Sequence, residues 1–170
     1  MTDTMTAAAA RSITAGPPKL DSLAHVSLPC RDLAEGKRFY LGVLGGTIRV
    51  DHPQFAAITI AGSEIGIGTE GCTFIEPGAE YPHIAFYCGP DALLAMKDWL
   101  TRCGIPSSNF WTRRGTEALM FFRDPSGNMI ELFCVKGFKG ADQLPKGPPA
   151  GHGIAIDVNE LRYTTWNLPA

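Results

Sequence analysis

Apolar and polar residues alternate in two short segments of the chain, and helical spacing follows each segment. LAHVSLPC, residues 23–30, precedes a helical pattern that opens at Asp32, and PHIAFYC, residues 82–88, precedes one that opens at Asp91. Alternation predicts half-buried strands, because successive strand side chains point to opposite faces. Three further strand candidates follow in each half, namely residues 46–51, 55–60 and 64–69, and residues 110–113, 117–123 and 128–135. The sequence therefore predicts a unit of strand, helix and three strands that occurs twice.

Capping and turn residues bound the predicted elements. Asp32 and Asp91 are expected as N-caps, since a short carboxylate can accept hydrogen bonds from the free amides of the first helical turn. Gly45 and Gly104 stand where the two helices should end. The sequence DPSGN, residues 124–128, predicts a tight turn that joins the last two strands into a hairpin. Each helix should bury one apolar stripe, formed by Phe39, Tyr40, Val43 and Leu44 in the first helix and by Leu93, Met96, Lys97 and Leu100 in the second.

The 170 residues suit one ordinary domain of the α+β class. We expect two modules, residues 21–69 and 82–135, that share one domain over residues 21–135. Residues 1–20 are expected to form a flexible arm, because the longest apolar stretch in the segment is four alanines and the segment ends near a Pro-Pro break. Residues 136–170 have no counterpart in the modules. Their aromatic residues predict a C-terminal extension that docks on the domain or on a partner subunit.

Composition and charge narrow the function classes. The net charge is −2 and basic residues form no stripe, so nucleic-acid binding is not predicted. The sequence contains no run of about 18 apolar residues, so a transmembrane helix is not predicted. The N-terminal segment does not have the pattern of a signal peptide. The five cysteines are odd in number and form no C-x-x-C pair, which indicates reduced thiols and a cytoplasmic location rather than disulfides or structural zinc.

Three residues with metal-ligating side chains occupy matched strand positions. By strand parity, His25, His83 and Glu131 each lie on the face opposite the aliphatic residues that should pack under a helix. A single histidine or glutamate in a strand usually packs or is solvated. Two imidazoles and one carboxylate at corresponding positions of a repeated pattern instead predict a facial triad for one divalent metal ion.

Three segments carry a resemblance to a known family. HVSLPCRDLAEGKRFYLGVLGG, PHIAFYC and FRDPSGNMIELF are similar to the vicinal oxygen chelate superfamily, over about residues 23–135. That superfamily includes glyoxalase I, extradiol dioxygenases, methylmalonyl-CoA epimerase, fosfomycin-resistance thiol transferases and bleomycin-binding proteins. The resemblance implies two βαβββ modules whose mixed sheets form a cup around a metal ion. It also implies that His25, His83 and Glu131 are the ligands and that the protein is a homodimer.

Departures from the family pattern bear on the reaction. Glyoxalase I and the epimerase add a fourth ligand late in the first module, where this chain has Gly66, with Glu64 one pleat away as a substitute. A three-ligand site favours the dioxygenase and fosfomycin branches. Both of those branches commonly carry a tyrosine ten residues before the last ligand, where this chain has Phe121. We expect a dioxygenase-like enzyme; a thiol transferase, an isomerase or lyase on the same metal, and a protein that sequesters a small molecule remain alternatives.

The expected chemistry is that of a Lewis acid that holds two neighbouring substrate oxygens. Oxygen and imidazole ligands favour Fe(II) or Mn(II), with Zn(II), Ni(II) and Co(II) as alternatives. Tyr87 is the candidate acid, base or orienting residue. Arg113, Arg114 and Arg123 could reach the rim and steer an anionic substrate. By parity, a largely apolar wall suited to a small aromatic or hydrophobic substrate is lined by Ser27, Leu119, Phe121 and Phe133.

Overall fold

A computed structural model describes residues 22–70, 82–147 and 160–169 of the protein. The first module forms a four-stranded sheet in which the strand order is β1-β4-β3-β2. Strand β1 runs parallel to β4, whereas β3 is antiparallel to both β4 and β2. The elements of this module are β1 (His25–Pro29), α1 (Leu33–Gly42), β2 (Thr47–Asp51), β3 (Phe55–Ile60) and β4 (Ser63–Gly68).

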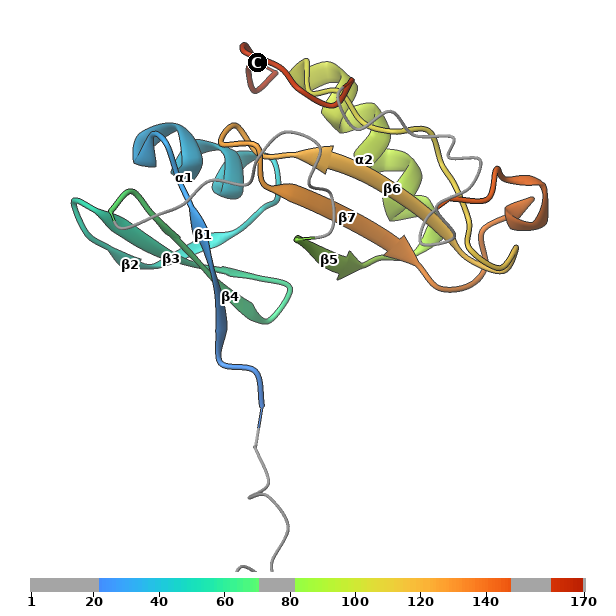
Figure 1. Ribbon diagram of the computed structural model, residues 1–170, viewed down its shortest axis with the longest axis horizontal. Coiled ribbons are helices and arrows are strands. Elements are labelled where there is room, and N and C mark those ends of the chain that lie inside the picture. Colours follow the sequence, from blue (N-terminus) through green and yellow to red (C-terminus); the bar gives the residue numbers. More distant parts are fainter. Residues whose placement is uncertain (1–21, 71–81, 148–159, 170) are drawn as a thin grey trace, which may run out of the picture.

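The second module repeats this arrangement with one strand fewer, in the order β5-β7-β6. Its elements are β5 (His83–Tyr87), α2 (Pro90–Cys103), β6 (Ala118–Arg123) and β7 (Met129–Cys134), followed by the 3₁₀ helix η1 (Ala141–Gln143). The two mixed sheets and two helices confirm the predicted α+β class (Figure 1).

The strand predicted over residues 110–113 is wrong: this segment forms only isolated bridges, such as the one between Trp111 and Leu119. The reason is the buried side chain of Glu117. Its Oε1 accepts hydrogen bonds from the backbone amides of Arg113 and Arg114, both at 3.0 Å. Backbone amides captured by a carboxylate are not available to a neighbouring strand, so the chain turns here instead of extending.

The helix boundaries follow the local sequence with one exception. Asp32 caps α1 as predicted, because its Oδ1 accepts from the amides of Ala34 at 2.9 Å and Glu35 at 3.0 Å. The predicted cap Asp91 is wrong. Helix α2 begins at Pro90, with Gly89 as its N-cap, since proline suits the first helical position and has no amide to be capped. Asp91 therefore lies inside the first turn.

The two modules share one apolar core, built from the helices and the buried faces of both sheets. Phe39 on α1 lies 6.5 Å from Phe122 on β6, measured between ring centroids. Next to them, the hydroxyl of Tyr40 donates to Oδ2 of Asp124 at 2.9 Å. The predicted stripes of both helices thus meet a common core, with Phe39, Tyr40, Leu93 and Leu100 fully buried.

The predicted turn over residues 124–128 forms and also fastens the modules together. Asp124 accepts hydrogen bonds from the amides of Ser126 at 2.9 Å and Asn128 at 2.8 Å. The Asn128 side chain donates to the carbonyl of Pro29 at 2.9 Å, and the Ser126 hydroxyl accepts from the Arg31 amide at 2.9 Å. Burial raises the pKa of Asp124. The β6–β7 turn is therefore held against the end of β1.

The described part of the C-terminal segment packs on both modules: the Tyr163 hydroxyl donates to the Arg123 carbonyl on β6 at 2.9 Å, and Trp166 packs on α1. Trp166 is 5% exposed, and its ring lies edge-on to Phe39 with 5.8 Å between centroids. Its Nε1 donates to Oε1 of Glu35 at 3.0 Å, and the guanidinium of Arg38 lies 4.0 Å from the ring centroid. The predicted arm, residues 1–20, lies outside the described residues, as do residues 71–81 and 148–159. In the described part of the chain, the helices are too short or too polar to cross a membrane.

Candidate metal centre

Two of the three predicted ligands come together in the second module. Strand β5 runs parallel to β7, with His83 beside Met129 and Ala85 beside Glu131. Nε2 of His83 lies 3.4 Å from Oε2 of Glu131. Two ligand atoms at about 2.1 Å from a tetrahedral metal ion are about 3.4 Å apart, and about 3.0 Å apart when they are at right angles. The observed distance therefore suits two ligands of one ion.

The carboxylate of Glu131 is buried and has different partners at its two oxygens. The side chain is 2% exposed, and Oε1 accepts a hydrogen bond from Nη2 of Arg113 at 3.1 Å. A buried carboxylate is costly unless it is paired. The pairing at Oε1 leaves Oε2 directed toward His83.

The aromatic surroundings fix the histidine ring. His83 lies edge-on to Phe121, with 5.6 Å between ring centroids and 68° between ring planes. Phe121 is in turn opposite Glu131 in the β6–β7 ladder. Phe121 is 4% exposed and packs on Trp111, with 5.3 Å between the ring centroids. The phenyl ring that stands where two branches of the family commonly have a tyrosine thus packs against the candidate ligand His83.

The third predicted ligand, His25, is not brought to the same point. Within the residues that the structure describes, no three His, Cys, Asp or Glu side chains are placed to hold one metal ion. His25 lies on β1 beside Glu64 of β4. Glu64 forms an ion pair with Arg49, and that hydrogen bond lowers its pKa. Convergence of the triad within one chain, as strand parity predicts, is therefore not observed.

The reason lies in how the modules pack. They are joined through α1 and the β6–β7 turn, and in the described part of the chain β1 and β5 are edge strands of separate sheets. A shallow cavity of about 300 Å³ separates these edges, with residues 23–26 and 63–65 on one wall and residues 83–86 on the other. His25 and His83 thus line opposite walls of one cavity. Figure 1 shows β1 and β5 on the facing sides of their sheets.

Gly66 occupies the place in the first module that Glu131 has in the second. Ser27 is beside Gly66 in the β1–β4 pair, just as Ala85 is beside Glu131 in the β5–β7 pair. Ile65 and Ile67 are buried on the other face of β4, as their predicted register requires. Gly66, Gly68 and Ser27 help to line a hollow of about 400 Å³. The position where a fourth ligand is predicted in the related enzymes therefore has no side chain here and borders this hollow.

The remaining predicted site residues differ in exposure. Tyr87 is 77% exposed and stacks on Phe133, with 5.6 Å between ring centroids. Leu119 and Phe121 are buried in a second apolar cluster together with Trp111. Ser27 and Tyr87 are thus accessible, Phe133 is half-buried, and Leu119 and Phe121 are buried.

The sequence did not indicate that Arg113 contacts Glu131 or that Glu117 organises the loop between Trp111 and β6. Glu117 is completely buried, although its position was assigned to a strand. A charged residue directly before the apolar run ALMFF is the available signal, since a buried carboxylate requires hydrogen-bond donors nearby. Burial raises the pKa of Glu117, but hydrogen bonds from Thr116, Arg113 and Arg114 lower it by more, so the pKa lies below its ordinary value.

Comparisons with known proteins identify the family of the chain. Residues 22–132 match the family model described as the glyoxalase/bleomycin resistance protein/dioxygenase superfamily. The chain is 33% identical over 147 residues to the protein named glyoxylase I 4 of Arabidopsis thaliana. The aligned region covers 79% of this chain and 79% of the plant protein.

Solved structures share the fold. The FosX fosfomycin resistance protein of Listeria monocytogenes superposes with a TM-score of 0.62 at 20% identity, covering 69% of this chain and 94% of that one. A variant of the same FosX, solved with Mn(II) and a dihydroxypropylphosphonic acid, gives a TM-score of 0.59 at 20% identity, with 68% and 93% covered. Lactoylglutathione lyase of Agrobacterium tumefaciens superposes with a TM-score of 0.56 at 19% identity, covering 69% of this chain and 95% of that one.

Proposed function

The chain belongs to the glyoxalase/bleomycin resistance protein/dioxygenase superfamily, and from that premise we propose that it is an enzyme that uses one divalent metal ion to hold two neighbouring oxygens of a small substrate. The observation that carries the proposal is the 3.4 Å separation between Nε2 of His83 and Oε2 of Glu131. Both atoms are good ligands for a divalent ion, and one of them belongs to a buried carboxylate whose other oxygen is already paired.

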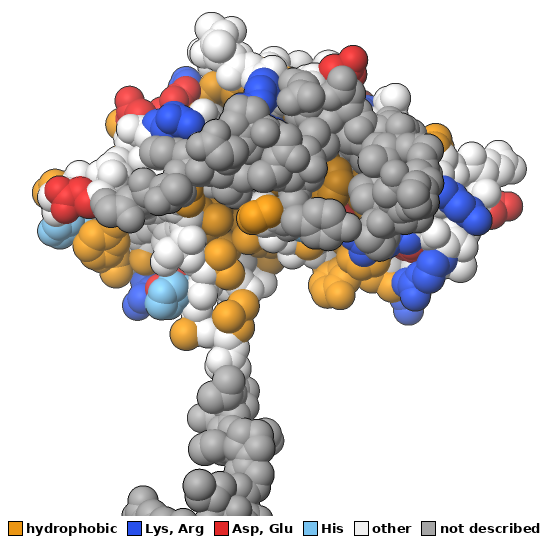
Figure 2. All heavy atoms as spheres, viewed as in Figure 1, with side chains coloured by type: hydrophobic (Ala, Val, Ile, Leu, Met, Phe, Trp, Pro, Cys, Tyr) orange, Lys and Arg blue, Asp and Glu red, His pale blue; other side chains and the backbone are white. Residues whose placement is uncertain are grey.

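The third ligand in this proposal is His25 of a second copy of the chain. Among the described strands, β1 and β5 are edge strands, each with one side that pairs with no other described strand, and an open edge is a ready template for association. Large apolar side chains are exposed beside them, with Leu23 at 81% and Tyr87 at 77% exposure. Figure 2 shows hydrophobic side chains, in orange, on the lower face of the molecule in that view. A symmetric dimer that brings β1 of each copy to β5 of the other would create two identical sites.

When bound, the metal would act as a Lewis acid that polarises the substrate oxygens. The chain's own residues do the positioning. Arg113 holds Glu131 so that Oε2 faces His83, and Phe121 holds the His83 ring. Fe(II) and Mn(II) suit the proposed set of two imidazoles and one carboxylate, with Zn(II), Ni(II) and Co(II) as alternatives.

A dioxygenase-like reaction is our first candidate because Gly66 contributes no ligand. A metal ion held by His83, Glu131 and His25 of a second copy would keep positions free for substrate oxygens and would supply the chemistry that a dioxygenase needs. A second candidate, a lyase, isomerase or thiol transferase on the same metal, is supported by the similarity to glyoxylase I 4. A protein that only sequesters a small molecule is the third.

Metal titration tests the metal site. The wild-type protein is expected to bind one Mn(II) per chain, and His83→Ala and Glu131→Ala should weaken binding at least about a hundredfold. His52→Ala is the matched control, since His52 is exposed in a turn and stacks on Phe55. Stoichiometric metal that survives both substitutions at the site would contradict the assignment.

Two assays separate the reactions. Oxygen uptake with a panel of catechols supports the dioxygenase. Turnover of glutathione adducts or epoxides without oxygen uptake supports the second candidate and overturns the first. Ligand binding that chelators leave unchanged, without turnover, indicates sequestration.

A further inference from the structure

The guanidinium of Arg113 lies inside the candidate metal centre and is held there from several sides. Its Nη2 is 3.1 Å from Oε1 of Glu131. Its central carbon is 5.3 Å from the ring centroid of Trp111 and 5.6 Å from that of Phe133, within the range of a cation–π contact. The side chain is nevertheless 34% exposed. Arg113 is therefore fixed in place and still open to a ligand.

The loop that carries Arg113 is built to present it. Glu117 is completely buried and accepts from the Arg113 and Arg114 amides at 3.0 Å each and from the Thr116 hydroxyl at 2.7 Å. The Thr112 hydroxyl accepts from the Gly115 amide at 2.8 Å. Two side chains thus satisfy the loop's backbone donors, so the backbone of Arg113 is fixed without a strand.

Two buried N–H groups at this place have no acceptor in the described residues. They are Nε of Arg113 and Nε1 of Trp111, and the Trp111 side chain is fully buried. Buried N–H donors seldom remain unpaired in native structures. Neither side chain can accept a hydrogen bond, so both need an oxygen from elsewhere. Among the described residues, the site accordingly has more donors than acceptors.

We propose that Arg113 binds an acidic group of the substrate, a carboxylate or a phosphonate, beside the oxygens that the metal holds. This inference rests on the metal site of the proposed function and specifies its substrate class. A guanidinium has five N–H donors in a planar fork that matches an oxyanion, and Glu131 accepts from one of its nitrogens. Arg113 and His83 contact the two oxygens of one carboxylate, that of Glu131. The acidic group must therefore lie close to the chelated oxygens.

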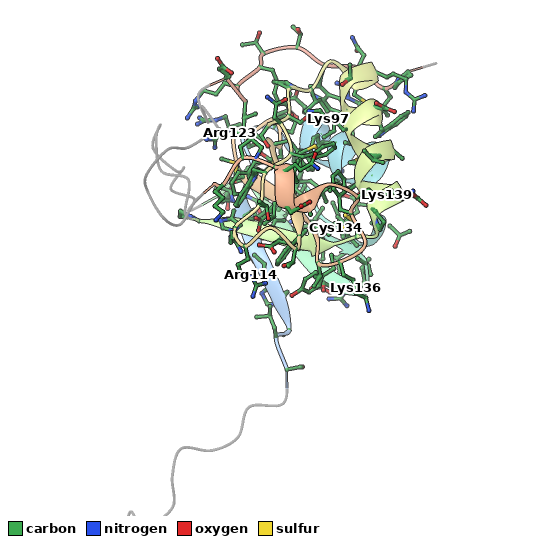
Figure 3. The ribbon with its side chains drawn as sticks, turned by 90° about the vertical axis from the view of Figure 1, so that its right-hand side faces the viewer. Lys97, Arg114, Arg123, Cys134, Lys136 and Lys139 are labelled. Atoms are coloured by element: carbon green, nitrogen blue, oxygen red, sulfur yellow. The ribbon has the colours of Figure 1, made fainter. Side chains whose placement is uncertain are left out.

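The neighbouring Arg114 provides a control that distinguishes direct pairing of Arg113 with the acidic group from long-range attraction by any positive charge. Arg114 is 73% exposed, and its Nε is 3.7 Å from Oε1 of Glu117. Figure 3 shows Arg114 near the edge of the molecule and Cys134, which is fully buried, nearer its centre. Loss of either arginine removes one positive charge, and long-range attraction would respond similarly to both losses. Direct pairing would respond to the loss of Arg113 alone.

The test uses three compounds that share one chelating group: catechol, 3,4-dihydroxybenzoate and 3,4-dihydroxyphenylphosphonate. Each is titrated into the full-length protein loaded with Mn(II), and the ratio of dissociation constants to that of catechol is recorded. The ratio cancels any change in the metal itself. The wild type is expected to prefer at least one acidic compound by about tenfold or more, and the preferred compound identifies carboxylate or phosphonate.

Arg113→Gln should reduce that preference to about one, Arg113→Lys should retain part of it, and Arg114→Gln should leave it unchanged. A wild type without preference overturns the inference, as does a preference that survives Arg113→Gln or falls equally in Arg114→Gln. If Mn(II) does not bind, the proposed function is wrong. In that case the same titrations of the metal-free protein decide about Arg113, and equal or absent binding of all three compounds overturns its role.

Discussion

The hydroxyl of Tyr40 on α1 donates to the buried carboxylate of Asp124 at 2.9 Å, and this bond ties the first module to the β6–β7 turn of the second. Burial raises the pKa of both groups, and the Asp124 charge raises that of Tyr40 further. Tyr40 and Asp124 therefore form a buried polar link within the apolar core. That link sets the relative position of the two sheets, and with it the separation of His25 from His83.

Tyr40→Phe should lower the free energy of unfolding by about 1.5–3 kcal/mol, because a hydrogen bond to a buried charged group is lost. Urea unfolding at neutral pH measures the change. Tyr87→Phe is the matched control, since Tyr87 is 77% exposed, and it should change stability by less than about 0.5 kcal/mol. Equal effects of the two substitutions would contradict the link.

Stability should fall on acidification partly through Glu117. The pKa of this carboxyl in the unfolded chain is near the ordinary value of 4.5, and in the folded protein it is lower. The unfolded chain therefore takes up the proton first as the pH falls. The resulting stabilisation is complete above about pH 4.5 and is lost as the pH falls through the lower folded value.

Glu117→Ala should remove this part of the acid dependence and lower stability at neutral pH by about 2 kcal/mol, since backbone amides lose their acceptor. Urea unfolding at several pH values between neutrality and strong acid shows the difference. Glu160→Ala serves as the control, because Glu160 is exposed. An unchanged acid limb in Glu117→Ala would show that the carboxylate does not stabilise the loop.

Trp166→Ala should destabilise the protein by about 3–5 kcal/mol, because a large buried ring is removed from the first module. The ring contacts Phe39, and its Nε1 donates to Glu35. Thermal unfolding measures the loss, with Leu94→Ala, an exposed apolar position, as the control. Similar melting temperatures for wild type and Trp166→Ala would mean that the C-terminal segment does not dock in solution.

Gly66→Glu should add a fourth ligand. A Cβ at Gly66 would lie 3.1 Å from the Ser27 hydroxyl, which can rotate away, so the fold should tolerate the change. Mn(II) affinity is expected to rise about tenfold with the added carboxylate. Gly68→Glu is the control, since it lies on the same face one pleat further and its Cβ would make only ordinary contacts. Equal gains from both variants would indicate general electrostatic attraction instead of ligation.

Strand parity and the repeated pattern were sufficient to pair His83 with Glu131, because both lie in one module and face the same side of one sheet. The same reasoning failed for His25. Its distance from His83 depends on how two separate sheets pack, and that packing is set by contacts between distant residues such as Tyr40 and Asp124.

Local sequence also missed the loop before β6. Residues 110–113 have the apolar content of a strand, but the chain turns at Arg113, where the Glu117 carboxylate accepts from the amides of Arg113 and Arg114. Capping was predictable for Asp32 and not for Asp91, because Pro90 takes the first helical position and the N-cap is Gly89, two residues before Asp91. In both cases one side chain, the Glu117 carboxylate or the Pro90 ring, changed the backbone pattern that the surrounding residues predict.

Mixing two variants that each lack the metal site tests the central claim most directly. The claim is that one metal is held by His83 and Glu131 of one chain and by His25 of another. His25→Ala and His83→Ala are each expected to lack tight Mn(II) sites. Refolded together in equal amounts, they should regain about a quarter of the wild-type sites, because half of the dimers are mixed and each mixed dimer has one intact site. Tight Mn(II) binding by His25→Ala alone, or a mixture that regains no sites, would contradict the account.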